Sequence, residues 1–193
     1  MKSLSTLLLM VISCLGFGQV KNTHDYIPLT KQDGLTKVFK AGNNTFEDYF
    51  IEGISVLNGK EYFIKVRKYS WGSVDTSYYR EDELNYYHFD KKNGKESIVM
   101  PKNIIVGHTW LEADSSWYYE VSSINEVLQT PSSKYTDVVV LKCMQMTNRD
   151  KNKGQIYFIY YAKDFGMVGS ASNGKLHAWL SEVRKEKPKG KKK

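Results

Sequence analysis

The sequence predicts a mainly β domain, formed by a single curved antiparallel sheet or a half-open barrel of hairpins with little helix. Short segments rich in Val, Ile, Tyr, Phe and Trp follow one another from residue 49 to residue 180, and their polarity alternates with a period of two. Asn-Gly dipeptides separate several of these segments, at residues 58–59, 93–94 and 173–174. Asn-Gly favours the tight turn of a β-hairpin because both residues tolerate positive φ.

The first 18 residues have the three parts of a secretory signal peptide. Lys2 supplies the positive charge, residues 7–15 form the apolar run, and Gly16 and Gly18 are the small residues before a cut at Gln19. The apolar run is too short to cross a bilayer core of ~30 Å, and no later segment is apolar enough to do so. We therefore expect an exported protein, periplasmic or extracellular, without a transmembrane span.

The two cysteines lead to one alternative and one expectation. Residues 11–14 also fit a lipobox, which would make Cys14 the lipidated residue of an outer-membrane lipoprotein, but apolar rather than polar residues follow it. Removal of the signal peptide leaves Cys143 as the only cysteine, so the mature domain has no internal disulfide. Cys143 lies in an apolar segment and is expected to be a small buried side chain.

The β domain is expected to span residues 19–183, and its elements follow in order. Residues 20–48 are polar and weakly patterned, with a turn at residues 42–45. Strands are expected at residues 51–57, 61–67, 85–90, 96–100, 116–121, 137–146, 155–161, 166–168 and 176–180. With eight to ten strands, such a sheet must curl, fold over or close to limit its exposed edges.

The segment 61–67 shows the alternation most plainly. Tyr62, Ile64 and Val66 share one face and are expected in the core. Lys65 and Arg67 share the other face with Glu61 and are expected in water.

Two stretches near the C-terminus resemble a known family. Residues 160–168 (Tyr-Tyr-Ala-Lys-Asp-Phe-Gly-Met-Val) resemble a signature of the TapB-like family of exported bacterial β domains, and residues 129–138 are similar to its Pro-containing turn before a core strand. Residues 57–62 and 107–110 match the family's spacing, so the resemblance covers roughly residues 50–180. It implies a curved, half-open antiparallel sheet of the kind used by periplasmic lipid-handling lipoproteins, and no reaction. Asp164 departs from the pattern, which tends to have Gly there.

Motifs for catalysis, metals and cofactors are absent from the sequence. It has no His-Glu-x-x-His, no Cys-x-x-Cys, no calcium loop, no Gly-x-Ser-x-Gly and no phosphate-binding glycine loop, so we assign no catalytic residue, metal or cofactor. His88 and Asp90 share a strand face and are interpreted as a solvated strand end. A hydrolase with an unrecognised site stays open; it would need His88, His108 or His177 to meet a serine or carboxylate in a pocket.

Paired tyrosines supply the candidate binding residues. Adjacent strand residues point to opposite faces, so each pair sends one ring outward. The outward rings form cross-strand ladders or line a groove for a lipid, glycan or peptide. The candidate ligand or partner contacts are Trp71, Tyr79, Tyr87 and Tyr118, of which Trp71 lies on an expected loop.

The net charge of +7 lies almost entirely in the last ten residues. Residues 19–183 hold 20 basic and 20 acidic side chains, which does not support nucleic-acid binding. Residues 184–193 are expected to be a disordered basic tail that either solubilises the chain or contacts anionic envelope surface. The candidate contacts to that surface are Lys189, Lys191, Lys192 and Lys193.

The combined prediction is a non-enzymatic exported domain that binds an apolar or amphipathic ligand, or an envelope protein, on a concave sheet face. The groove is expected to be lined by Tyr, Ile and Met with few titratable groups. The alternatives are the unrecognised hydrolase and a purely structural interaction module.

Overall fold

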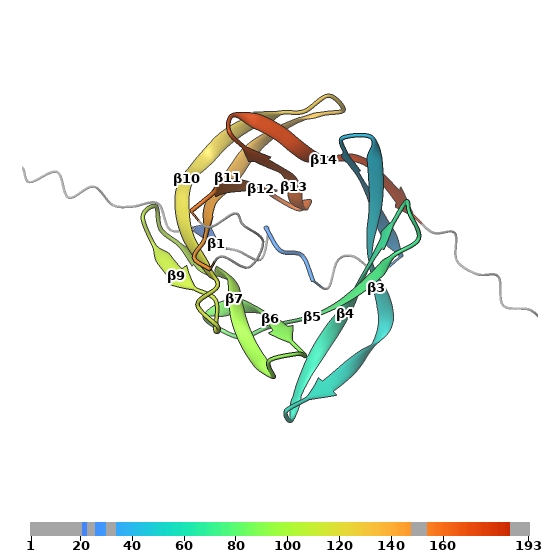
Figure 1. Ribbon diagram of the computed structural model, residues 1–193, viewed down its shortest axis with the longest axis vertical. Coiled ribbons are helices and arrows are strands. Elements are labelled where there is room, and N and C mark those ends of the chain that lie inside the picture. The colour runs from blue at the N-terminus through green and yellow to red at the C-terminus, as the bar shows by residue number, and fades with distance from the viewer. Residues whose placement is uncertain (1–20, 23–25, 30–33, 148–153, 186–193) are drawn as a thin grey trace, which may run out of the picture.

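The computed structural model describes residues 21–22, 26–29, 34–147 and 154–185, and all regular structure within them is β-strand (Figure 1). The N-terminal half contains β1 (Lys21–Asn22), β2 (Leu35–Ala41), β3 (Asn44–Leu57), β4 (Lys60–Tyr69), β5 (Val74–Glu81), β6 (Asn85–Asp90) and β7 (Lys95–Pro101). The C-terminal half contains β8 (Asn103–Ile104), β9 (Thr109–Leu111), β10 (Trp117–Gln129), β11 (Lys134–Gln145), β12 (Ile156–Ala162), β13 (Gly166–Ser172) and β14 (Lys175–Lys185). The signal peptide, Cys14 and the tail lysines at 189, 191, 192 and 193 lie outside the described residues.

Twelve strands form one antiparallel sheet in the order β7-β6-β5-β4-β3-β2-β14-β13-β12-β11-β10-β9. Neighbours in the chain pair with each other, and one long-range pairing, β14 with β2, joins the two halves. The sheet curls until its end strands β7 and β9 approach, which gives a nearly closed barrel with one unsealed seam (Figure 1). The predicted fold class is confirmed, with more strands than the eight to ten expected.

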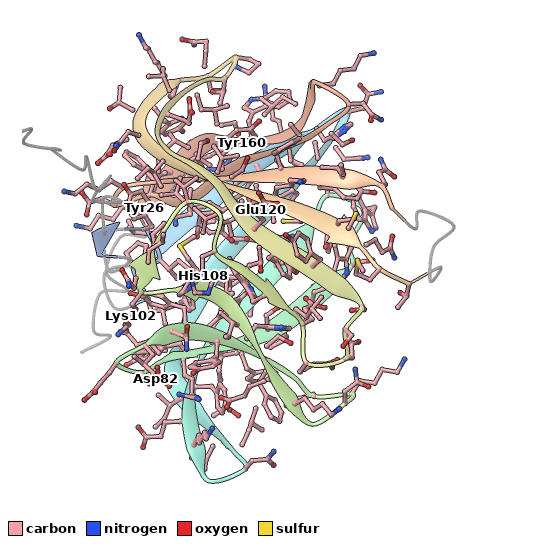
Figure 2. All side chains as sticks on the ribbon, turned by 90° about the vertical axis from the view of Figure 1, so that its left-hand side faces the viewer. Tyr26, Asp82, Lys102, His108, Glu120 and Tyr160 are labelled. Carbon is pink, nitrogen blue, oxygen red and sulfur yellow. The ribbon has the colours of Figure 1, made fainter. Side chains whose placement is uncertain are left out.

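The seam is bridged by side chains instead of a backbone ladder. The indole Nε1 of Trp110 on β9 donates a hydrogen bond of 2.9 Å to the carbonyl oxygen of Ile98 on β7. The backbone amide of Ala113 donates one of 3.0 Å to the hydroxyl of Ser97. Figure 2 views the molecule from this side and labels His108, the residue that precedes β9 in the chain. The barrel is thus held shut here by few polar contacts.

The tight turns follow the local sequence. Asn58-Gly59 joins β3 to β4 with φ of 50° and 74°, and Asn173-Gly174 joins β13 to β14 with φ of 49° and 70°. Both are two-residue turns with positive φ at both positions, as predicted. Asn93-Gly94 instead ends a longer loop in which only Gly94 has positive φ. Asp164 adopts a φ of 63°, which aspartate tolerates.

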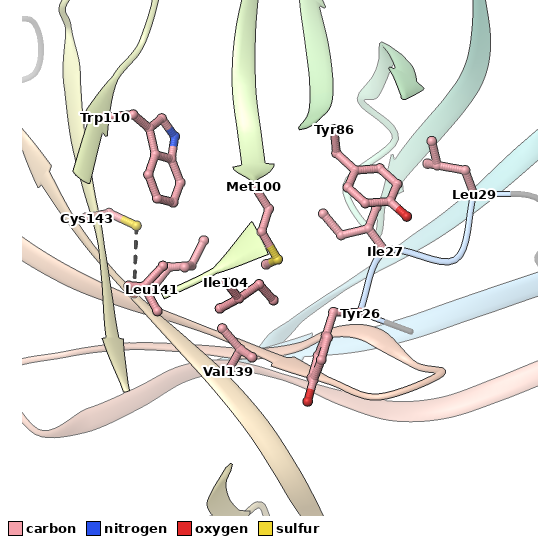
Figure 3. Close-up of a cluster of buried hydrophobic side chains, with 11 residues drawn as sticks. Tyr26, Ile27, Leu29, Tyr86, Met100, Ile104, Trp110, Val139, Leu141 and Cys143 are labelled. Carbon is pink, nitrogen blue, oxygen red and sulfur yellow. Dashed lines mark hydrogen bonds between the residues drawn. The ribbon is translucent and has the colours of Figure 1, made fainter. Parts of the chain in front are cut away.

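Residues 26–29 pass through the barrel interior and complete its core (Figure 3). They were expected to be part of a weakly patterned polar region. Their apolar side chains pack in a cluster made of Tyr26, Ile27, Leu29, Tyr86, Met100, Ile104, Trp110, Val121, Val139, Leu141 and Cys143. A second cluster gathers around Phe39, Phe46, Val138, Val168 and Leu180.

Cys143 is buried, as expected for a small apolar side chain, and is a free thiol. Burial and the nearby Glu112 raise the pKa of this thiol to about 12. The thiolate form needed for reactivity is therefore absent at neutral pH.

Two predictions about position are wrong. Lys65 and Arg67 do not face water, because their side of β4 lines the barrel interior. The opposite side is covered as well: Tyr62 is buried against Phe89, and its hydroxyl donates a 2.7 Å hydrogen bond to Glu96. At the C-terminus, β14 continues to Lys185, so the first two residues assigned to the basic tail belong to the sheet.

Candidate ligand-binding cavity

The barrel interior contains a cavity of about 260 Å³, partly open to solvent, beside the segment 26–29. Its walls come from β2, β3, β4, β5, β7, β12 and β13, so strands distant in the sequence meet around it. Alternation along each curved strand sends every second side chain into this space. The apolar wall consists of Ile27, Pro28, Leu29, Phe39, Phe50, Val99 and Met167, with Tyr26, Tyr69, Tyr79 and Tyr161 adding aromatic rings.

Charged side chains also line the cavity, which corrects the expectation of few titratable groups. Asp48 on β3 lies opposite Arg67 on β4, and the two form a bidentate pair with N–O distances of 2.7 Å. Lys65 lies 3.6 Å from the same carboxylate. Burial alone would raise the pKa of Asp48, but the hydrogen bonds from Arg67 and the charge of Lys65 lower it, so Asp48 is an anion at neutral pH.

Lys65 packs between this carboxylate and the aromatic wall. Its ammonium nitrogen lies 4.7 Å from the centre of the Tyr79 ring. Burial would lower the pKa of Lys65, yet Tyr79 and Asp48 together raise it. Lys65 is thus a half-buried cation with two favourable partners.

Lys37 on β2 is the third cation of the cavity and the least compensated. It is only 8% exposed, and its amine donates a hydrogen bond to the backbone carbonyl of Phe165 in the β12–β13 turn. No ion pair joins it to a carboxylate within the part of the chain that the structure describes. Burial, with a smaller contribution from Lys65, lowers the pKa of Lys37 to about 8, against the attraction of Asp48.

One of the four predicted contact residues lines the cavity, one packs on a lining residue, and two do neither. Tyr79 lines it directly. Trp71 is exposed on its loop and stacks at 4.4 Å on Tyr69, which lines the cavity. Tyr87 lies under the guanidinium of Arg80, 4.1 Å from it, and Tyr118 contacts Glu120; neither borders the cavity.

The three histidines that the structure describes do not meet in one pocket. His108 and His177 are exposed, and His88 packs beside Tyr79 at 5.4 Å between ring centres. His177 does share a hydrogen bond with Ser172, but Ser172 is almost fully buried in β13 and borders no described cavity. A serine nucleophile needs an open face toward its substrate, which this pair lacks. Among the described residues, no cluster of His, Cys, Asp or Glu could hold a metal ion.

Several cavity residues were not predicted from the sequence to line a binding site. Lys37 and Asp48 fall in a region with weak patterning, and Lys65 and Arg67 were assigned to the wrong face. The alternation of Lys65 and Arg67 with apolar residues identifies two faces of a strand but not which one is enclosed. The sequence does contain one indication of this site: Lys65 and Arg67 lie two residues apart on one strand, and Asp48 lies opposite Arg67 on the neighbouring strand.

Comparison of the chain with protein-family models, with curated proteins and with solved structures returned no match. The TapB-like resemblance therefore stays a prediction. Within the described ranges, no helix is long and apolar enough to cross a membrane.

Proposed function

We propose that this protein is a non-enzymatic binding domain that holds a small amphipathic molecule inside its barrel. The observation that carries the proposal is the cavity of about 260 Å³ with an aromatic and apolar wall. Ligand sites are typically concave and mostly apolar, with a few polar groups that orient the ligand. The cavity has this composition, with its polar groups on β2, β3, β4 and β5.

The barrel architecture supports binding in the interior over binding on an outer face. Of the four predicted contacts, only Tyr79 and, through Tyr69, Trp71 are connected to the cavity. Trp71 stands exposed beside the cavity wall, where an indole would contact a ligand on entry. Export to the periplasm or the outside is proposed from the N-terminal sequence alone.

Matched substitutions on β5 test the proposal. Ser77 lines the cavity, whereas Thr76 next to it is exposed on the opposite face. Ser77→Phe should fill the cavity, and Thr76→Phe adds the same ring outside it. We expect saturable binding of Nile red, a neutral fluorophore, to the wild-type protein and to Thr76→Phe, and loss of binding in Ser77→Phe.

Circular dichroism and thermal unfolding of both variants check that each is folded. Equal binding of the probe by the two variants, or no saturable binding by the wild-type protein, would refute an internal site. If only Ser77→Phe loses binding, extraction of the purified wild-type protein followed by mass spectrometry would identify a natural occupant of the cavity.

A further inference from the structure

We infer that the cavity selects a ligand with a single oxyanion head group, held by Lys37, and an apolar tail that lies along the aromatic wall. This inference rests on the proposed function and adds the chemical class of the ligand. A carboxylate and a phosphate monoester share the required chemistry, and the experiment below separates them.

The charges around the cavity do not cancel. Lys37, Lys65 and Arg67 supply three positive charges, and Asp48 and Asp75 supply two negative ones. Asp75 is exposed on β5, and strands β4 and β3 lie between it and Lys37 on β2. An isolated buried charge is costly unless it is paired, and this excess of positive charge favours a ligand with an anionic head group.

The existing pairs direct that charge to Lys37. Arg67 occupies both oxygens of Asp48, and Lys65 shares one of them. Lys37 donates one hydrogen bond to the carbonyl oxygen of Phe165. Because an ammonium group has three N–H donors, others can bind a ligand. An oxyanion on Lys37 also faces Lys65, whose charge already acts on Lys37.

The backbone around Lys37 is shaped for close approach. Gly166 has a φ of 74°, and a Cβ there would lie 3.2 Å from the amine of Lys37. A glycine at this position therefore lets the amine of Lys37 pack directly against the backbone of the β12–β13 turn. Met167 and Tyr161 continue the wall from this point and supply the apolar surface for a tail.

The other titratable groups facing the cavity do not replace the ligand. The phenol of Tyr161 is neutral at physiological pH, since burial raises its pKa, and burial together with Asp75 raises that of Tyr69. Burial and the charge of Lys65 lower the pKa of His88, which keeps its imidazole neutral. Tyr26 and Tyr79 are the remaining phenols of the wall.

Competition against bound Nile red tests the inference with four probes of one chain length: decanoate, decyl phosphate, decanol and decyltrimethylammonium. We expect decanoate or decyl phosphate to displace the fluorophore at concentrations about tenfold or more below those of decanol, with the cation weakest. Preference for one anion over the other identifies the head group. Lys37→Met should remove the preference for the anion and leave the affinity for decanol unchanged, and Lys68→Met, at an exposed lysine of β4, should preserve it.

Equal affinity for decanol and both anions in the wild-type protein would overturn the anion site while leaving the proposed function intact. Failure of all four probes, together with loss of saturable Nile red binding, would overturn the proposed function itself.

A second experiment uses only the wild-type protein, so its result does not depend on whether a variant folds. Calorimetric titrations of decanoate near pH 8.5 in buffers of different ionisation enthalpy should show net proton uptake, because an anion raises the pKa of Lys37. Absence of uptake would contradict a contact with Lys37.

Discussion

Replacing Lys37 with methionine should stabilise the ligand-free protein at neutral pH, and the gain should shrink as the pH rises. In the folded chain the pKa of Lys37 falls from 10.5 to about 8 because the amine is buried. The unfolded chain therefore binds more protons between these two values, so the stability of the wild-type protein rises with pH across that window. Methionine removes the titrating group and with it this dependence.

The magnitude follows from the size of the shift. A change from 10.5 to about 8 corresponds to about 3 kcal/mol of destabilisation at pH values below 8. At about pH 9.5 the folded protein holds Lys37 mostly neutral, and the remaining cost is about 1 kcal/mol. The difference in unfolding free energy between variant and wild type should thus fall by about 2 kcal/mol from pH 7 to pH 9.5. The gain at neutral pH itself is smaller than the full cost, because the carbonyl of Phe165 loses its donor, at about 1–3 kcal/mol.

Urea unfolding of ligand-stripped protein, followed by tryptophan fluorescence at both pH values, measures this difference. Other lysines and tyrosines titrate over the same range, but they are common to both proteins and cancel. Lys68→Met serves as the control, since Lys68 is exposed and its removal should leave the pH dependence unchanged. Parallel stability curves for the wild-type protein and Lys37→Met would show that Lys37 is not a buried cation and would refute the reasoning.

Further changes probe the seam and the core. Trp110→Phe removes the hydrogen bond to Ile98 that bridges the seam and should cost about 1–3 kcal/mol in urea unfolding, whereas Trp71→Phe on an exposed loop should cost under about 0.5 kcal/mol; equal costs would contradict the bridging role. Leu141→Ala leaves a cavity in the interior cluster and should cost about 2–5 kcal/mol by the same measurement; a change below about 0.5 kcal/mol would mean that Leu141 is not buried. Cys143 should resist a disulfide reagent such as DTNB in the native protein and react only in denaturant, because its thiol is buried with a raised pKa; fast labelling of the native chain would contradict its placement.

The strands with strong alternation and the turns between them could be predicted because their signals are local. Asn58-Gly59 adopts positive φ at both positions, and the apolar runs on either side pair as the two strands of a hairpin. Three strands of the large sheet were missed, β2, β5 and β9, and β5 shows the complementary reason. Val74–Glu81 is largely polar, and it is a strand because β4 and β6 supply hydrogen-bonding partners on both of its edges.

The candidate site depended on information that is not local. Tyr79 was identified as a binding residue from its pairing with Tyr78 alone, and the structure places it on the cavity wall. Tyr87 and Tyr118 satisfied the same criterion yet lie elsewhere. A pair of adjacent tyrosines ensures one ring on each face, but the closure of the sheet decides which ring meets the cavity.

The amino-acid sequence by itself determined the β class, the antiparallel hairpins, the buried thiol and the neutral charge of the body, because each depends on composition or on a few neighbouring residues. Only the tertiary structure decided which face of each strand is enclosed. Curling twelve strands toward the β7–β9 seam placed Lys37, Lys65 and Arg67 inside, where burial changes their chemistry. The physical reason is that alternation defines two faces of a strand equally well, and the interior is chosen by the closure of the whole sheet.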